Sequence, residues 1–161
     1  WVKLMYGSSG QQEVLWILML AFATILEKKK SFIIIEEPEA HLFPIAQKDA
    51  MNLISLMINS TNSKVIITTH SPYILTSTNI LLFSEKVENR HTKLNKVVIP
   101  KNLRVSYENF AAYKVDDSEK VLESLLDEES HMINTNYIDE VSSITNNELD
   151  ELITMEIDND L

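Results

Sequence analysis

The stretch FIIIEEP, residues 32–38, gives the clearest indication of how this chain folds. Its first four residues are apolar and three of them are β-branched, which predicts a short β-strand. Because the run is continuous and not alternating, we expect a central strand of a parallel sheet, buried on both faces. Glu36 and Glu37 follow the strand directly, at the edge where open α/β sheets bind their ligands.

The segments around this strand alternate between helical and extended patterns. Residues 11–28 lack Gly and Pro and predict a helix. Apolar residues cover almost every face of it, so we expect the helix to be buried on most sides. The other predicted elements are a helix over 44–59, a strand over 64–69, a short helix that begins at Ser71 and Pro72, and strands over 80–83 and 96–99. This alternation predicts an α/β fold with a parallel sheet flanked by helices.

Charge divides the chain near residue 115. The net charge is −10, and residues 115–161 hold 15 of the 24 acidic residues but only one basic residue, Lys120. We therefore predict two parts, a lobe over residues 1–114 and an acidic tail over residues 115–161. Within the tail, residues 117–129 and 148–157 predict acidic amphipathic helices that pack on the lobe or on a partner protein. The tail should repel nucleic acid.

Composition excludes several classes of protein. Gly7 and Gly10 are the only glycines, so the chain has no dinucleotide-binding loop and no GxxxxGK[ST] phosphate loop. The absence of cysteine excludes disulfides, thiolate zinc sites and a cysteine nucleophile. The longest apolar run, residues 14–26, is shorter than the roughly 20 residues of a spanning helix, which predicts a soluble, cytoplasmic protein without membrane contact. Because the chain starts with Trp1, we interpret it as a fragment.

Basic residues gather in residues 86–104, where a single acid, Glu88, accompanies six Lys and Arg. We interpret this stretch as a solvated loop and edge strand in preference to a nucleic-acid contact, because no aromatic residues are interleaved with the charges. Whether the protein touches nucleic acid stays open.

Two further motifs accompany the Glu36–Glu37 pair. His70 follows the second predicted strand, so a parallel pairing of the two strands would bring its imidazole near the two carboxylates. Residues 7–13 form a Ser/Gly loop that opens into the first helix and offers free backbone N–H groups to an anion. In that loop, the spacing of Ser9 and Gln12 predicts a capping box.

In this order the three motifs resemble the C-terminal half of an ABC-type ATPase domain, and the sequences EEPEAHLFP and TTHSP are similar to the RecF/SMC/OLD-like branch of these AAA-family ATPases. The resemblance covers about residues 4–84. It implies a P-loop NTPase fold, of which this chain would be the C-terminal lobe, and a setting in DNA repair or anti-phage defence. Residues 85–161 show no pattern of the Toprim nuclease domain that such proteins often carry.

The resemblance also implies roles for individual residues. Glu36 matches the Walker B acid that holds Mg²⁺ through water, Glu37 the catalytic glutamate that positions the attacking water, and His70 the switch histidine near the γ-phosphate. The signature loop, which contacts ATP bound to the opposite subunit, is matched by Ser8, Ser9, Gly10 and Gln11. Residues 39–43 stand where the D-loop begins, and its usual Asp is absent.

The implied function is a Mg²⁺-dependent ATPase subunit that dimerises head to tail around ATP and switches a DNA-handling or defence effector. Because the Walker A loop is missing, residues 1–161 alone should be inactive. One alternative is a non-catalytic scaffold that binds a partner through a degenerate ATPase half. The other is a metal-dependent hydrolase or nuclease that uses Glu36, Glu37, Glu39, His41 and His70.

Overall fold

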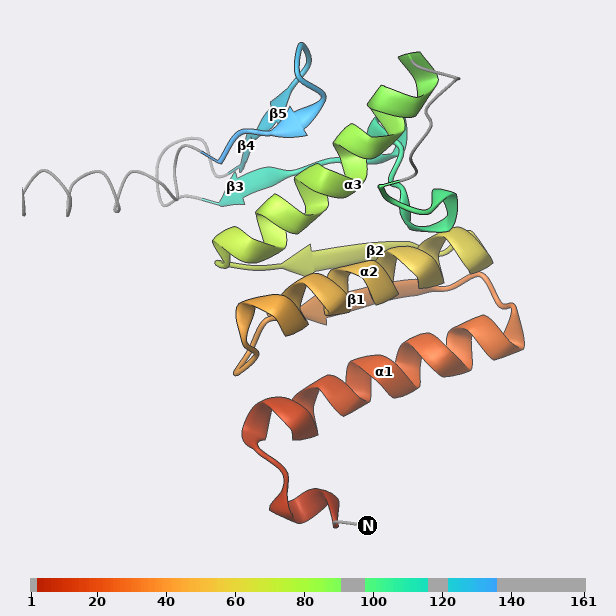
Figure 1. Ribbon diagram of the computed structural model, residues 1–161, viewed down its shortest axis with the longest axis vertical. Helices are drawn as coiled ribbons and strands as arrows, with labels where there is room; N and C mark the ends of the chain where they lie inside the picture. Colours follow the sequence, from red (N-terminus) through yellow and green to blue (C-terminus); the bar gives the residue numbers. More distant parts are fainter. Residues whose placement is uncertain (1–2, 91–97, 116–121, 136–161) are drawn as a thin grey trace, which may run out of the picture.

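The computed structural model describes residues 3–90, 98–115 and 122–135 (Figure 1). Three long helices and a two-stranded parallel sheet form the main body, and two short hairpins lie beside the third helix. The elements are η1 (Leu4–Tyr6), α1 (Ser9–Glu27), β1 (Phe32–Glu36), α2 (Pro44–Thr61), β2 (Lys64–Thr68), α3 (Pro72–Arg90), η2 (Lys101–Leu103), η3 (Tyr107–Asn109), β3 (Tyr113–Val115), β4 (Leu122–Ser124), β5 (Leu126–Asp127) and β6 (Met132–Ile133).

The predicted strand–helix–strand unit is confirmed. β1 pairs with β2 in parallel, in a register that places Phe32 opposite Lys64 and Glu36 opposite Thr68. α2 makes the crossover between the strands and begins at Pro44, whose missing N–H costs nothing in the first turn. The two strands therefore end at the same edge of the sheet, as the sequence predicted.

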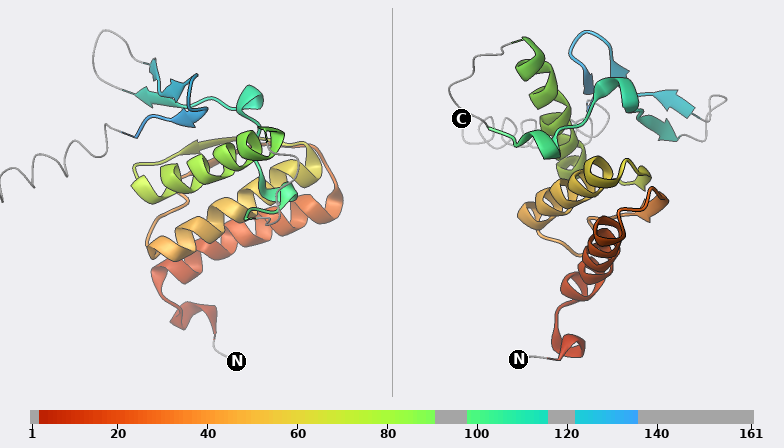
Figure 2. Two further views of the ribbon diagram at one scale, coloured as in Figure 1. Left: turned by 45° about the horizontal axis from the view of Figure 1, so that its top comes forward. Right: turned by 90° about the vertical axis from the view of Figure 1, so that its right-hand side faces the viewer.

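The core lies between the helices and one face of the sheet. Ile33 and Ile35 of β1 are buried against Ala21 of α1, Ile54 of α2 and Ile74 of α3. Figure 2 shows this arrangement, with the three helices on the same side of the two strands. These contacts hold the strand ends, and with them the acids that follow β1, in a fixed position.

The opposite face of the sheet is exposed, and the prediction that β1 is buried on both faces is wrong. Phe32 is 64% exposed, Ile34 59% and Ile66 of β2 49%. Alternate residues of β1 point to the two faces, and the described residues cover only one of them. The apolar run in β1 makes both faces of the strand suitable for burial. It does not show whether another element of the protein covers the second face.

The prediction for the first helix is wrong in the same way. α1 forms as predicted, but only Gly10, Ala21 and Thr24 in it are buried, whereas Trp16 is 68% and Phe22 65% exposed. One side of α1 contacts α2, and large apolar side chains on the other side are exposed. Among the described residues α1 is also the one helix long and apolar enough to cross a membrane by length and composition, a test that buried core helices and signal sequences also pass. The absence of membrane contact stays a prediction.

The predicted short helix after Pro72 is in fact 19 residues long and includes the predicted strand over residues 80–83. Leu81 and Leu82 are 1% exposed, while Ile80 and Phe83 are 41% and 43% exposed. Two buried residues flanked by two exposed ones fit the 3.6-residue period of a helix, which four consecutive apolar residues cannot distinguish from a strand.

The other C-terminal predictions are corrected in part. Val98 and Ile99 lie in a bend, not a strand, and residues 96–97 lie outside the described residues. Residues 122–129 form β4, β5 and a turn where a helix over 117–129 was predicted. The predicted helix over 148–157 lies outside the described residues. The predicted boundary between residues 114 and 115 stays a prediction.

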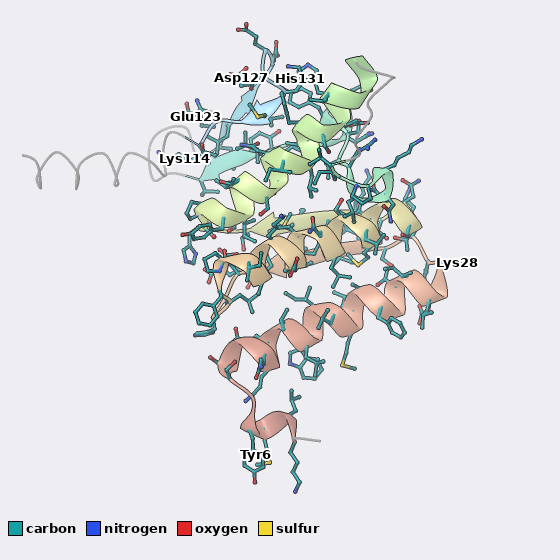
Figure 3. The ribbon with its side chains drawn as sticks, in the orientation of Figure 1. Tyr6, Lys28, Lys114, Glu123, Asp127 and His131 are labelled. Atoms are coloured by element: carbon teal, nitrogen blue, oxygen red, sulfur yellow. The ribbon has the colours of Figure 1, made fainter. Side chains whose placement is uncertain are left out.

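Side chains of α3 hold the β5–β6 hairpin through hydrogen bonds to the backbone of the hairpin. The Asn79 side chain donates to the Ile133 carbonyl at 3.0 Å and accepts from the Ile133 N–H at 2.7 Å. Lys86 Nζ donates to the carbonyls of Glu129 and Ser130. N–H donation from Ser130 and Glu129 holds the pKa of Asp127 below its usual range. Figure 3 shows Asp127 at this turn beside α3.

Candidate functional site

The ends of β1 and β2 bring two of the predicted catalytic residues together. The Glu37 N–H donates to the Thr68 carbonyl at 2.9 Å, which continues the ladder one residue beyond the strands. His70 Nδ1 lies 3.5 Å from Glu37 Oε1. The predicted proximity of His70 to Glu37 is therefore confirmed, while the catalytic roles stay a prediction.

Both side chains are accessible to a ligand. The Glu37 side chain is 55% exposed and that of His70 76% exposed, and Glu36, the last residue of β1, is exposed as well. The backbone at Glu37 has φ 43°, a left-handed conformation that residues other than Gly seldom adopt and that often occurs at functional sites. The surrounding hydrogen bonds thus fix the backbone of Glu37 in a conformation that local preferences alone would not select.

A buried polar network lies beneath this pair. Glu39 is 5% exposed, and its Oε1 accepts hydrogen bonds from Thr69 Oγ1 at 2.6 Å and from the His70 N–H at 3.0 Å. Thr69 Oγ1 also accepts from the Ser71 N–H at 3.0 Å. The turn after β1 is therefore tied to the segment after β2.

Ser71 extends the network to α2 and α3. Its hydroxyl donates to Gln47 Oε1 at 2.6 Å and accepts from the N–H groups of Tyr73 and Ile74 at the start of α3. Gln47 Nε2 in turn donates to the Leu42 carbonyl at 2.9 Å. Ser71 thus acts as the predicted cap of α3 and also fixes the helices around the site.

The Ser/Gly loop before α1 forms the capping box one residue earlier than predicted. Ser8 Oγ, and not that of Ser9, accepts from the Gln11 N–H at 3.3 Å, and Gln11 Oε1 accepts from the Ser8 N–H at 3.0 Å. Gln12 instead donates from Nε2 to the Gly7 carbonyl at 2.9 Å. Ser8, Ser9 and Gln11 are exposed.

Gly10 is buried against the turn that follows β1. A Cβ at this position would lie 2.2 Å from the His41 carbonyl oxygen, so only glycine fits without a shift of backbone. The N-terminus of α1 therefore packs directly on residues 41–42, close along the chain to Glu37 and Glu39. Close packing against the His41 carbonyl is enough to explain why position 10 is a glycine, without a role in nucleotide binding.

His41 joins α1 and not the strand ends. Its Nδ1 lies 3.0 Å from Glu13 Oε2, and the hydrogen bond and charge of Glu13 raise the pKa of His41. Glu39, in contrast, lies at the strand ends, with its Oε1 3.6 Å from His70 Nδ1. The hydrolase set of Glu36, Glu37, Glu39, His41 and His70 is therefore not assembled around one centre, and the described residues contain no group of three or more His, Asp or Glu suited to hold a metal.

The exposed carboxylates of Glu36 and Glu37 are suitable ligands for Mg²⁺. This ion is usually bound by one or two carboxylates together with waters and substrate phosphates. Glu36 and Glu37 offer hard oxygen atoms at the end of β1, accessible to solvent. A nucleotide-bound Mg²⁺ needs no complete cage of protein side chains at this edge.

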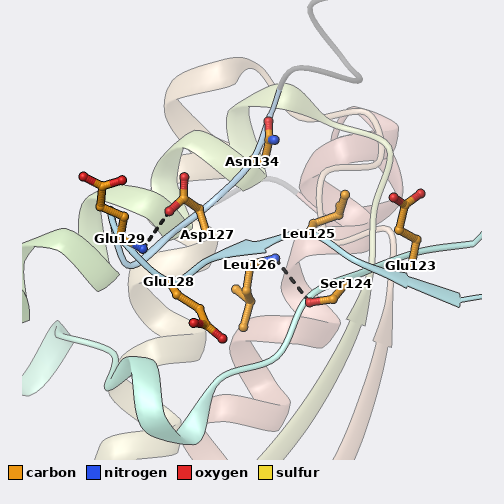
Figure 4. Close-up of a pocket in the computed structure, with 8 residues that line it drawn as sticks. All are labelled: Glu123, Ser124, Leu125, Leu126, Asp127, Glu128, Glu129 and Asn134. Atoms are coloured by element: carbon orange, nitrogen blue, oxygen red, sulfur yellow. Dashed lines mark hydrogen bonds between the residues drawn. The ribbon is translucent and has the colours of Figure 1, made fainter.

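A pocket of about 440 Å³ lies elsewhere, on the hairpin region (Figure 4). It is lined by residues 123–129 and Asn134. None of the predicted ATPase residues contributes to it, so we assign it no part in the site.

Residues 2–75 match the family described as AAA ATPase domain. The matched stretch includes the loop over residues 8–11, the Glu36–Glu37 pair and His70. The match supports an AAA-type ATPase domain in this part of the chain and agrees with an α/β P-loop fold; it does not distinguish branches of the superfamily. No curated protein and no solved structure matches the chain.

The buried network around Glu39 and Gln47 was not predicted from the sequence. Glu39 appeared only as part of the D-loop region and of the hydrolase alternative, and Gln47 was not singled out. The available signal was a third carboxylate two residues after Glu37, next to Pro38, whose ring limits the turn geometry. Its burial depends on the fold of β2 and could not be read from local pattern.

Proposed function

We propose that this chain provides the C-terminal lobe of an ATP-binding and ATP-hydrolysing subunit of the RecF/SMC/OLD-like branch. The observation that carries the proposal is the 3.5 Å approach of His70 to Glu37 at the ends of two parallel strands. The AAA ATPase match over residues 2–75 supports the ATPase part of the proposal independently.

In this proposal each exposed side chain at the strand ends has a separate role in ATP hydrolysis. Glu36 holds Mg²⁺ through water, and the bound ion would neutralise phosphate charge. Glu37 orients a water molecule and accepts its proton, and His70 hydrogen-bonds the attacking water or a phosphate oxygen at the same edge. The loop Ser8–Gln11 presents exposed hydroxyl groups at the N-terminus of α1, where the helix dipole favours an anion.

The phosphate-binding loop must come from outside residues 1–161, because Gly7 and Gly10 are the only glycines. We propose that a further segment of the protein or another chain supplies it. We further propose a cytoplasmic homodimer or higher oligomer that forms head to tail around ATP and switches a DNA-handling or defence effector.

Nucleotide-dependent assembly tests this proposal. Replacing Glu37 with Gln in the complete protein should slow hydrolysis without loss of binding, so the variant should accumulate as an ATP-bound dimer. Sedimentation with ATP and Mg²⁺ should then show a dimer that the wild type forms only transiently. A Glu37→Gln protein that stays monomeric with ATP at high protein concentration would contradict the head-to-tail dimer.

A partner-binding scaffold is the second candidate, and the exposed apolar side chains favour it. Trp16 and Phe22 on α1, with Phe32 and Ile34 on β1, form apolar surface without cover among the described residues. A scaffold would capture its partner equally well in wild-type and Glu37→Gln protein and with or without ATP. ATP-dependent capture would favour the switch instead.

A further inference from the structure

We propose that Glu39 is a positioning residue of this site, which holds the Thr69–His70 segment so that the His70 imidazole stands beside Glu37. The inference rests on the proposed function and deepens it. No motif assigned this role, and it follows from the contacts of one buried carboxylate.

The burial of Glu39 sets it apart from its neighbours. Its side chain is 5% exposed, whereas those of Glu37 and His70 are more than half exposed. A carboxylate removed from water loses solvation and needs donors in return. Glu39 therefore acts through contacts with buried neighbours, either to stabilise the fold or to position the site, while Glu37 faces the solvent.

The donors of Glu39 come from the exit of β2. Thr69 Oγ1 donates to Glu39 Oε1 at 2.6 Å and the His70 N–H at 3.0 Å. These two bonds fix the backbone of His70 relative to the turn after β1. The register of β1 and β2 alone would end at Glu36 and Thr68.

The His70 ring lies between two carboxylates. Its Nδ1 is 3.5 Å from Glu37 Oε1 and 3.6 Å from Glu39 Oε1, so a small ring movement brings an Nδ1–H within hydrogen-bond length of either. Acceptors on the Nδ1 side favour the tautomer that carries its proton there, and leave Nε2 as the acceptor of the neutral ring.

The second oxygen of Glu39 supports an active role. Oε2 is buried and has no hydrogen-bond partner among the described residues. A buried acceptor without a donor is unfavourable, so a structural carboxylate would be expected to use both oxygens. Glu39 therefore has one buried oxygen without a donor beside Oε1, the oxygen that holds the Thr69–His70 segment.

The experiment compares Glu39→Ala, Glu39→Gln and Thr69→Val in the complete protein, with Glu27→Gln as a control at an exposed glutamate of α1. Gln can still accept both hydrogen bonds through its amide oxygen. Thr69→Val keeps the shape and removes the hydroxyl that donates to Glu39 and accepts from the Ser71 N–H. Steady-state ATP turnover gives kcat and KM, and long-range ¹H–¹⁵N spectra report the tautomer and position of the His70 imidazole. Thermal unfolding identifies the folded variants.

We expect Glu39→Ala to lower kcat by about tenfold or more, with a KM for ATP within about twofold of the wild type. Glu39→Gln should recover most of that loss, and Thr69→Val should lose less than Glu39→Ala. The His70 signals should shift in Glu39→Ala and stay unchanged in Glu27→Gln. If Glu39→Ala does not fold, Thr69→Val and Glu39→Gln decide the matter by the same two readouts.

A merely structural role would lower the melting temperature and leave kcat and the His70 signals of folded protein unchanged, which would overturn the inference. Failure of the proposed function looks different, because Glu37→Gln would then turn over ATP like the wild type. In that case the His70 spectra decide alone: displaced signals in Glu39→Ala support positioning, and unchanged signals contradict it.

Discussion

Glu13 and His41 form an ion pair between α1 and the turn after β1, and it makes this contact sensitive to pH. The raised pKa of His41 in the folded protein has Glu13 as its cause. Stabilisation from a raised histidine pKa is fully present below the unfolded pKa of about 6.5 and is lost as the pH rises through the folded pKa. The contact should therefore be strongest in mildly acidic solution.

Replacing Glu13 with Gln should move the NMR titration of His41 down, toward the ordinary range, because its charged acceptor is gone. The stability difference between wild type and Glu13→Gln should shrink as the pH is raised from about 5.5 to about 8.5. Chemical denaturation at several pH values measures it, with Glu27→Gln as the control. A difference that stays constant with pH would show that the pair does not form.

Gly10 allows a second prediction at this scale. In the first turn of a helix, Gly→Ala would ordinarily be neutral or stabilising, but the added Cβ at Gly10 meets the His41 carbonyl. We expect Gly10→Ala to lower the free energy of unfolding by about 1–3 kcal/mol. Gly7→Ala is the matched control, since its nearest atoms lie 3.1 Å away. Equal effects of the two changes would contradict the close packing of α1 on this turn.

At the residue scale the sequence predicted that Glu37 and His70 lie close together, because strand ends have local signals and neighbouring parallel strands end at the same edge of a sheet. It could not identify the capping residue within one position, since Ser8 and Ser9 both have a Gln three residues later. Nor could it show that Gly10 is needed for packing, which depends on a turn thirty residues away.

At the scale of single elements, β1 has two unequal faces. Ile35 is 7% exposed and packs in the core, and its neighbour Ile34 is 59% exposed on the other face. Ile35→Ala should cost about 2–4 kcal/mol of unfolding free energy, through lost burial and an added cavity. Ile34→Ala should cost less than about 1 kcal/mol.

Urea denaturation of the two variants measures the difference between their losses of unfolding free energy. Because both changes are Ile→Ala in the same strand, each variant controls for the effect of strand propensity in the other. Similar losses for Ile34→Ala and Ile35→Ala would contradict the exposed face. They would show that another element covers β1 in solution.

The long regular elements could be predicted because their signals are local. Pro44 marks a helix start, and four apolar residues followed by acids mark a strand end. Residues 122–129 misled the prediction because Leu122, Leu125 and Leu126 also fit a helical stripe. Their strands depend on pairing: β4 pairs with residues 113–115, and β5 pairs with β6, which contacts α3.

At the scale of the whole molecule, Asn79 joins the C-terminal hairpin to the helical body. Its side chain makes both a donor and an acceptor bond to the backbone of Ile133, a residue that is 4% exposed. Asn79→Ala leaves these buried groups unpaired, so it should cost about 1–3 kcal/mol.

Amide hydrogen exchange should locate that loss, with faster exchange at Ile133 and little change in β1 and β2. Thr76→Ala, at an exposed position of the same helix, is the control. Unchanged exchange at Ile133 in Asn79→Ala would mean that other contacts hold the hairpin.

The distribution of apolar and charged surface is also a property of the whole molecule. The sequence predicted where apolar residues are concentrated, in α1 and β1, but not that half of that surface faces outward. The candidate site combines both levels: its exposed pair follows from strand ends, while the Glu39 network depends on the packing of α2 and α3 around them.

The most direct measurement is the rate of ATP hydrolysis by the complete protein, for wild type, Glu37→Gln and the control Glu27→Gln. If Glu37 positions and deprotonates the attacking water, Glu37→Gln should reduce kcat by about 10²–10⁴-fold while Glu27→Gln retains the wild-type rate. Equal turnover in wild type and Glu37→Gln would contradict the assignment of the strand-end carboxylate as the catalytic base.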